Sequence, residues 1–175
     1  MKRPYAGALT GPLVAGLAND VASALSDAER AEGLSPGTLG LTGPSLDRLA
    51  VWTAAKGTSP DQLVTVLGLV LRGRIGPGGL RRTAGCVQRA VQRWQQRPID
   101  GQYAQVVLTV AAATSPVAEL SSRPVAMAVG SGDQMPDELL GLWAASPAHD
   151  PYLWRTVLID VRRRGRDCSS VCLAA

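Results

Sequence analysis

The 175-residue sequence contains no phenylalanine, and its other aromatic residues are only four Trp and three Tyr. Its core must therefore be built from Ala, Val and Leu, which suits closely packed helices better than a β-sandwich. The chain also has a single histidine, His149, no paired-carboxylate motif and no phosphate-loop lysine. With none of these signatures present, the sequence predicts no catalytic residue and a chain that is not an enzyme.

Cysteine is also scarce. Cys86, Cys168 and Cys172 are too few for a disulfide framework, and with His149 they match no zinc-binding spacing. We therefore expect no metal and no cofactor. No run of about eighteen uninterrupted apolar residues occurs, so we expect no membrane partner.

Acidic residues are missing from a long internal stretch. No Asp or Glu lies between Gln62 and Ile99, although the net charge of the whole chain is only +4. The stretch contains seven arginines: Arg72, Arg74, Arg81, Arg82, Arg89, Arg93 and Arg97. An ordinary solvated helix face mixes charges of both signs. This stretch is therefore expected to bind a partner that supplies negative charge, and arginine favours bidentate contact with phosphate or carboxylate.

The segment GGLRRTAGCVQRAVQRWQQRP, residues 78–98, has the period of an amphipathic helix. Apolar residues share one side: Leu80, Ala84, Val87, Val91 and Trp94. Arginines share the other side with Gln88, Gln92 and Gln96. A glycine-rich loop, RGRIGPGG, precedes the helix and can present backbone N–H groups to an anion. We predict that the seven arginines bind DNA phosphates; a basic surface without a partner is the alternative.

Helix-start signals recur along the chain, among them Thr-Gly-Pro, Ser-Pro and Asp-Pro. They predict helices near residues 12–31, 44–56, 60–72, 79–97, 101–114, 116–129, 136–145 and 151–164. The runs VTVLGLVL and VVLTVAAA also have strand propensity, but their caps and lengths favour buried helices. The expected fold class is all-α: a helical body over residues 33–175, with a C-terminal extension. Residues 1–32, with few charges before Asp20, are expected to project as a helical arm.

The C-terminal section raises a further possibility. A second basic cluster, Arg162, Arg163, Arg164 and Arg166, precedes the last four residues, CLAA. These four residues match a C-a-a-X lipidation box. They indicate one alternative function, a lipid-anchored helical adaptor. A cellular nucleic-acid-binding helical protein is the other alternative.

Several short motifs resemble a known family. These are LGLTGPS at Leu39–Ser45, Arg74-Ile75-Gly76, Gly78, Pro98 and Ser115-Pro116. In this order they resemble the major coat proteins of filamentous and rod-shaped archaeal viruses, over about residues 39–116. The resemblance implies a small all-helical protein that wraps A-form double-stranded DNA. It also implies a second coat subunit as partner, assembly into a helical filament, and a place in the virion.

Overall fold

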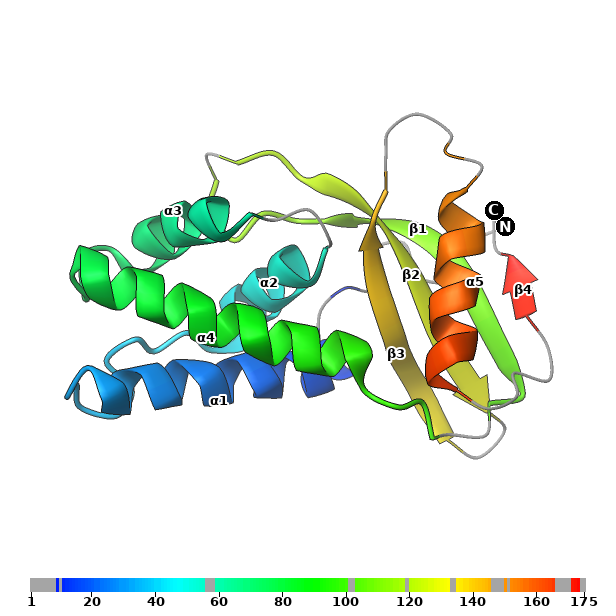
Figure 1. Cartoon of the computed structure of the whole chain (residues 1–175), viewed down its shortest axis with the longest axis horizontal. Helices are drawn as coiled ribbons and strands as arrows, with labels where there is room; N and C mark the ends of the chain where they lie inside the picture. Colours follow the sequence, from blue (N-terminus) through cyan, green and yellow to red (C-terminus); the bar gives the residue numbers. More distant parts are fainter. Residues whose placement is uncertain are drawn as a thin grey trace.

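The structure is a computed structural model that describes residues 9, 11–55, 59–100, 103–118, 120–132, 135–145, 150, 152–165 and 171–173. These residues form a helical part and a sheet part, which lie side by side (Figure 1). The helical part contains a short 3-10 helix, η1 (Gly11–Val14), followed by α1 (Ala15–Ala31), α2 (Gly43–Ala54), α3 (Pro60–Leu71) and α4 (Pro77–Gln96). The sheet part contains β1 (Gln105–Ala113), β2 (Arg123–Gly132), β3 (Met135–Ala144), α5 (Leu153–Arg164) and β4 (Val171–Leu173).

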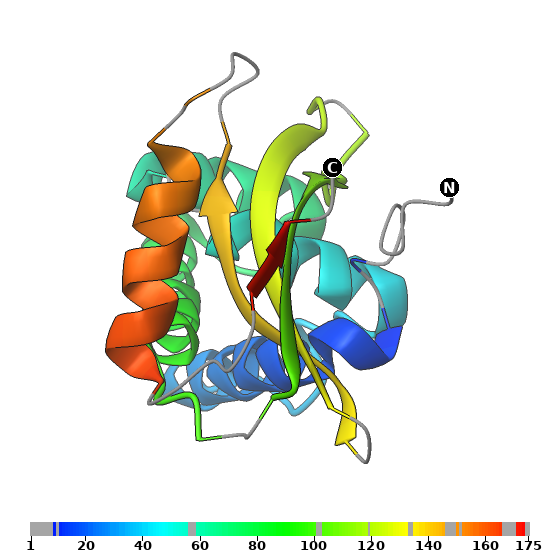
Figure 2. The same cartoon turned by 90° about the vertical axis from the view of Figure 1, so that its right-hand side faces the viewer.

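The four strands form one sheet in the order β3-β2-β1-β4 (Figure 2). β1, β2 and β3 are antiparallel neighbours, with Val107 opposite Val129 and Met127 opposite Leu142. β4 pairs in parallel with β1, and α5 is the crossover helix that the parallel pairing requires. The helical part packs on one face of the sheet and α5 on the other.

The expected all-α class is wrong, because the helices predicted at 101–114, 116–129 and 136–145 are instead β1, β2 and β3. The reason is burial on both faces. In β2, Val125, Met127 and Val129 join the core shared with the helical part, whereas Ala126 and Ala128 join the core under α5. A strand that is buried on both faces reads as a continuous apolar run, so the period of two that identifies a half-exposed strand is lost. The other five predicted helices agree with α1 to α5.

The projecting N-terminal arm is also absent from the described residues. Leu17, Val21 and Leu25 of α1 are at most 5% exposed and belong to the main core. Their partners are on α4 and α2 of the same chain, so the apolar side of this segment needs no second subunit. Residues 1–8 and 10 lie outside the described part.

The starts of the helices follow the local chemistry of the sequence. Ser59 accepts a hydrogen bond from the backbone N–H of Gln62, whose side chain accepts one from the N–H of Ser59. This capping box, with Pro60 in the first turn, defines the start of α3. In α4, an added Cβ at Gly79 would lie 2.4 Å from the Ile75 side chain, so glycine here permits close packing of the α3–α4 turn.

Three side chains from outside the sheet bind the backbone of its outer strand, β3. The Gln95 amide donates to the Leu142 carbonyl over 2.8 Å and accepts from the Leu142 N–H over 3.3 Å. Arg97 donates to the carbonyl of Leu139 over 2.7 Å, and Arg164 donates to that of Leu140 over 2.9 Å. These bonds satisfy backbone groups that β2 does not reach and fix α4 and α5 to the same strand.

A cation–π contact also joins the helical part to the sheet part. The guanidinium of Arg123, at the start of β2, lies 3.7 Å from the centre of the Trp52 ring on α2. This distance is typical of a cation–π contact. Burial lowers the pKa of Arg123, as expected of a cation held between α2 and the sheet.

The end of α1 is joined to α4 by an ion pair. Arg82 Nη2 donates to Glu32 Oε2 over 2.9 Å, and Arg82 Nε donates to the second carboxylate oxygen. This two-point hydrogen bonding from Arg82 lowers the pKa of Glu32 below its ordinary value and raises that of Arg82. The pair joins residues that are 50 positions apart in the chain.

Gln95→Met tests the attachment of α4 to β3. Methionine keeps the length of the side chain but offers no hydrogen bonds to Leu142, so two buried backbone groups lose their partner. We expect the free energy of unfolding to fall by about 1–3 kcal/mol, read from the urea midpoint at unchanged slope. Gln92→Met, on the exposed side of the same helix, is the control and should shift it by less than about 0.5 kcal/mol. Equal midpoints for the two variants would contradict the attachment.

Glu32→Gln tests the ion pair through its pH dependence. Because the folded-state pKa of Glu32 is lowered, its contribution to stability is present above the unfolded-state pKa and is lost as pH falls through the folded-state value. The variant should therefore melt below the wild-type protein at neutral pH, and the two should converge as the pH falls below the folded-state pKa of Glu32. Asp27→Asn removes an exposed pair with Arg30 and should change the melting temperature little at either pH. A gap that persists in acid would show that Glu32 acts by packing alone.

Candidate nucleic-acid interface

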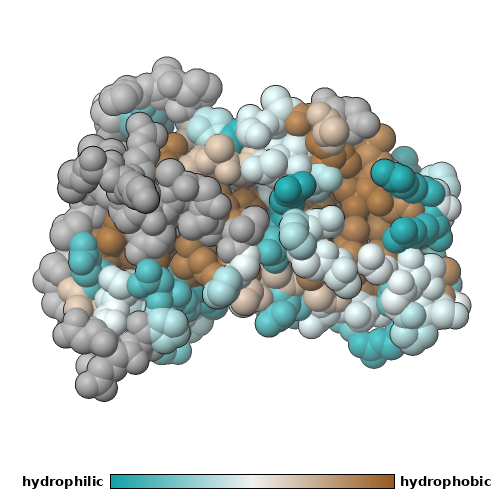
Figure 3. Space-filling model, turned by 180° about the vertical axis from the view of Figure 1, so that it is seen from behind, coloured by the Kyte–Doolittle hydropathy of each residue, from teal (hydrophilic) through white to brown (hydrophobic). Residues whose placement is uncertain are grey.

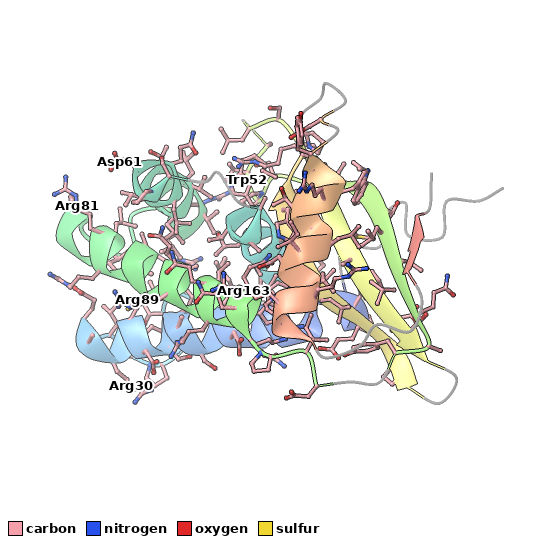
Figure 4. The ribbon with its side chains drawn as sticks, turned by 45° about the vertical axis from the view of Figure 1, so that its right-hand side comes forward. Arg30, Trp52, Asp61, Arg81, Arg89 and Arg163 are labelled. Atoms are coloured by element: carbon pink, nitrogen blue, oxygen red, sulfur yellow. The ribbon has the colours of Figure 1, made fainter. Side chains whose placement is uncertain are left out.

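The solvent-facing side of α4 carries exposed arginines. Arg81, Arg89 and Arg93 are exposed, and within the described residues none of them forms an ion pair. Arg89 Nη2 donates a hydrogen bond to Cys86 Sγ, on the preceding turn of the same helix, over 3.3 Å. Figure 4 shows Arg81 and Arg89 along this helix, with Arg81 at its N-terminal end. The amphipathic pattern predicted for residues 78–98 is confirmed: Ala84, Val87, Val91 and Trp94 on the opposite side are buried.

Two of the seven arginines predicted to bind DNA already have partners in the chain. Arg82 is paired with Glu32, as described above. Arg97 binds Glu138 over 3.0 Å and the carbonyl of Trp94 over 2.8 Å, and its guanidinium lies 4.3 Å from the Trp94 ring centre. The acid-free sequence around these residues did not reveal Glu32 and Glu138, because both acids lie far away along the chain.

The remaining two arginines, Arg72 and Arg74, are exposed in the turn between α3 and α4. Arg72 ends α3 in a left-handed conformation with φ of 46°, and Gly73 follows with φ of 75°. Both residues thus lie in the turn that leads into the N-terminal end of α4. The structure brings Arg72, Arg74 and Arg81 to one end of the helix and Arg89 and Arg93 to its middle and end.

A cleft of about 790 Å³ lies beside α4, bounded by α2, α3 and α5. Gln88, Gln92 and Gln96 line it from α4, and Asp160, Arg163 and Arg164 line it from α5. Figure 4 shows Arg163 at the end of α5 that lies beside α4. Two residues of the C-terminal arginine cluster, Arg163 and Arg164, therefore line this cleft, which the sequence pattern alone did not indicate.

The α5 arginines differ in their surroundings. Arg155, Arg162 and Arg163 are exposed, whereas the side chain of Arg164 is only 6% exposed and its Nε lies 3.6 Å from Asp160. Asp160 also accepts a hydrogen bond from Trp143 Nε1 over 3.2 Å. A spacing of four residues on a helix predicts the Asp160–Arg164 pair, but the burial of Arg164 depends on β3. His149, Arg166 and Cys168 lie outside the described residues, as does the side chain of Cys172.

The opposite face of the molecule has a different character. Seen from behind, apolar residues gather over the helical part (Figure 3). Among the described helices, none is long and apolar enough to cross a membrane.

One family model matches the chain: Transposase, Mutator family, over residues 65–174. No curated protein matches it. The family match overturns the resemblance to archaeal viral coat proteins, and with it the coat function and the place in the virion. It supports neither alternative, the cellular helical binder or the lipid-anchored adaptor. Transposases bind DNA, so DNA remains a partner, whereas coat subunits and a helical filament have no support.

The family match also corrects the expectation that the chain is not an enzyme, because transposases cleave and transfer DNA strands. Enzymes that displace phosphate esters commonly hold two metal ions between the reacting oxygens. Among the described residues, no group of three or more His, Cys, Asp or Glu side chains is placed to hold a metal ion. These residues do not fit such a centre, and no catalytic step is assigned to them.

The matched segment begins within α3 and continues through α4, the three antiparallel strands, α5 and β4. It thus covers more than half of the chain and includes both walls of the cleft that α4 and α5 form. The chain therefore belongs to the Mutator family of transposases.

Proposed function

We propose that this transposase-family chain binds double-stranded DNA, with the exposed side of α4 lying along the phosphate backbone. The observation that carries the proposal is that Arg81, Arg89 and Arg93 are exposed on one helix without an acidic partner in the described part of the chain. Guanidinium groups in this state are available to phosphate.

The dimensions of α4 suit this contact. Its 20 residues span about 30 Å, and a duplex carries roughly one phosphate charge per 1.7 Å of its axis. Arg72 and Arg74 extend the basic surface past the start of the helix.

Arg82 and Arg97 are left out of the proposed contact. Each would have to give up an ion pair inside the chain before it could bind phosphate. Their role in the proposal is structural: Arg82 fixes α4 to the end of α1, and Arg97 fixes the end of α4 to β3. They hold in place the helix that presents the other arginines.

Contacts with phosphate position a protein on DNA but do not distinguish one base sequence from another. The proposed binding is therefore largely independent of sequence and sensitive to salt. Selection of a particular DNA end would require groups other than these arginines.

The test is the salt dependence of duplex binding in an Arg89→Ala/Arg93→Ala variant. Each phosphate contact contributes about −0.9 to the slope of log affinity against log salt. Loss of two contacts should flatten the slope by about two units. The measurement is a series of duplex titrations at increasing salt, followed by fluorescence anisotropy.

The matched control is Arg30→Ala/Arg48→Ala, which removes the same charge from α1 and α2. Its slope should stay within about half a unit of the wild-type slope. Equal slopes for the two double variants would refute the proposed face, because net charge alone would then explain the binding.

A further inference from the structure

The cleft between α4 and α5 has a size that suits a small ligand. Its volume of about 790 Å³ falls within the usual range of ligand sites, roughly 300–1,000 Å³. A base-paired duplex is too wide to enter such a space, whereas an unpaired nucleotide is not. Ala54, Leu63 and Val91 contribute apolar surface to its walls, which suits the face of a base.

The charge of the cleft is unbalanced. Its charged lining residues are two arginines, Arg163 and Arg164, and one aspartate, Asp160. Arg164 is 6% exposed, and its Nε and Nη1 have no hydrogen-bond partner within the described residues. Burial lowers the pKa of Arg164, and the charge of Arg97 lowers it further, while Asp160 offsets only part of the effect. An anion in the cleft would compensate this buried positive charge.

The wall formed by α4 is neutral and polar. The side chain of Gln95 is bonded to Leu142, but the side chains of Gln88, Gln92 and Gln96 form no hydrogen bond within the described residues. An amide both donates and accepts, which suits the edges of nucleobases as well as sugar oxygens. The cleft thus places base-compatible amides across from phosphate-compatible arginines.

We propose that this cleft binds one unpaired nucleotide of a DNA strand, with its phosphate at Arg163 and in the field of Arg164 and its base against Gln88, Gln92 and Gln96. The proposal rests on the DNA-binding function proposed above, but it uses different residues and a different form of DNA. In this arrangement α4 serves two ligands. Its arginines bind a duplex backbone, and its glutamines bind a nucleotide that has left the duplex.

The test compares two adjacent arginines in the full chain. Arg163→Gln removes a cleft residue, and Arg162→Gln removes the same charge from an exposed residue that does not line the cleft. A labelled single-stranded hexanucleotide is titrated at fixed salt. Arg163→Gln should weaken its binding about tenfold, and Arg162→Gln about twofold or less. Equal weakening by both variants would overturn the proposal.

Gln92→Glu provides a second variant that does not depend on Arg164 or on the core. Gln92 is exposed, and the substitution adds one negative charge to the cleft with little change in shape. It should weaken hexanucleotide binding at least as much as Arg163→Gln. Unchanged binding would overturn the assignment of the α4 wall.

Competition identifies the ligand. A nucleoside monophosphate should displace the hexanucleotide from the wild-type protein at a lower concentration than inorganic phosphate does. Equal competition would show a plain anion site and overturn the nucleotide assignment.

If Arg89→Ala/Arg93→Ala leaves the duplex slope unchanged while Arg163→Gln and Arg162→Gln still differ in hexanucleotide binding, the duplex proposal fails and the cleft proposal stands. The reverse result retains the duplex face and removes the cleft.

Discussion

The structure depends on side chains that form hydrogen bonds with the outward-facing backbone groups of the outer strand β3. Gln95, Arg97 and Arg164 donate to consecutive parts of this strand, and Gln95 also accepts from it. An exposed strand edge is otherwise a site for unwanted pairing. Because the three side chains come from α4, the turn after it and α5, the same bonds that cover the edge also set where these two helices lie.

The two helices carry the groups that the proposed function uses. With Gln95 bonded to Leu142, the neighbouring positions 88, 92 and 96 face the cleft, and Arg89 and Arg93 remain exposed beside them. With Arg164 bonded to Leu140, its neighbour Arg163 reaches the cleft opposite α4. A structural bond at one position of each helix therefore orients the functional positions next to it. Loss of Gln95 or Arg164 is accordingly expected to disturb binding through position, without direct contact to DNA.

Sequence alone predicts the parts of this fold that local chemistry specifies. The Ser-Pro start at Ser59 and the amphipathic period of residues 78–98 were sufficient to predict α3 and α4. It could not distinguish β1, β2 and β3 from buried helices, because Val125–Val129 is apolar toward both layers. At the candidate site, the acid-free stretch predicted the exposed arginines Arg81, Arg89 and Arg93. It could not show that Glu32 pairs with Arg82 or that β3 buries Arg164, since both contacts join residues distant in the chain.

The proposed binding of duplex DNA to the exposed side of α4 can be tested at the arginine side chains themselves. The most direct measurement is a proton–nitrogen correlation spectrum of the arginine side-chain Nε–H groups, recorded while a short duplex is added. If duplex DNA binds α4, the signals of Arg81, Arg89 and Arg93 shift during the titration, while those of Arg30 and Arg48 do not. Shifts at Arg30 and Arg48 with unchanged signals on α4 would contradict the proposal and place the DNA on another face of the molecule.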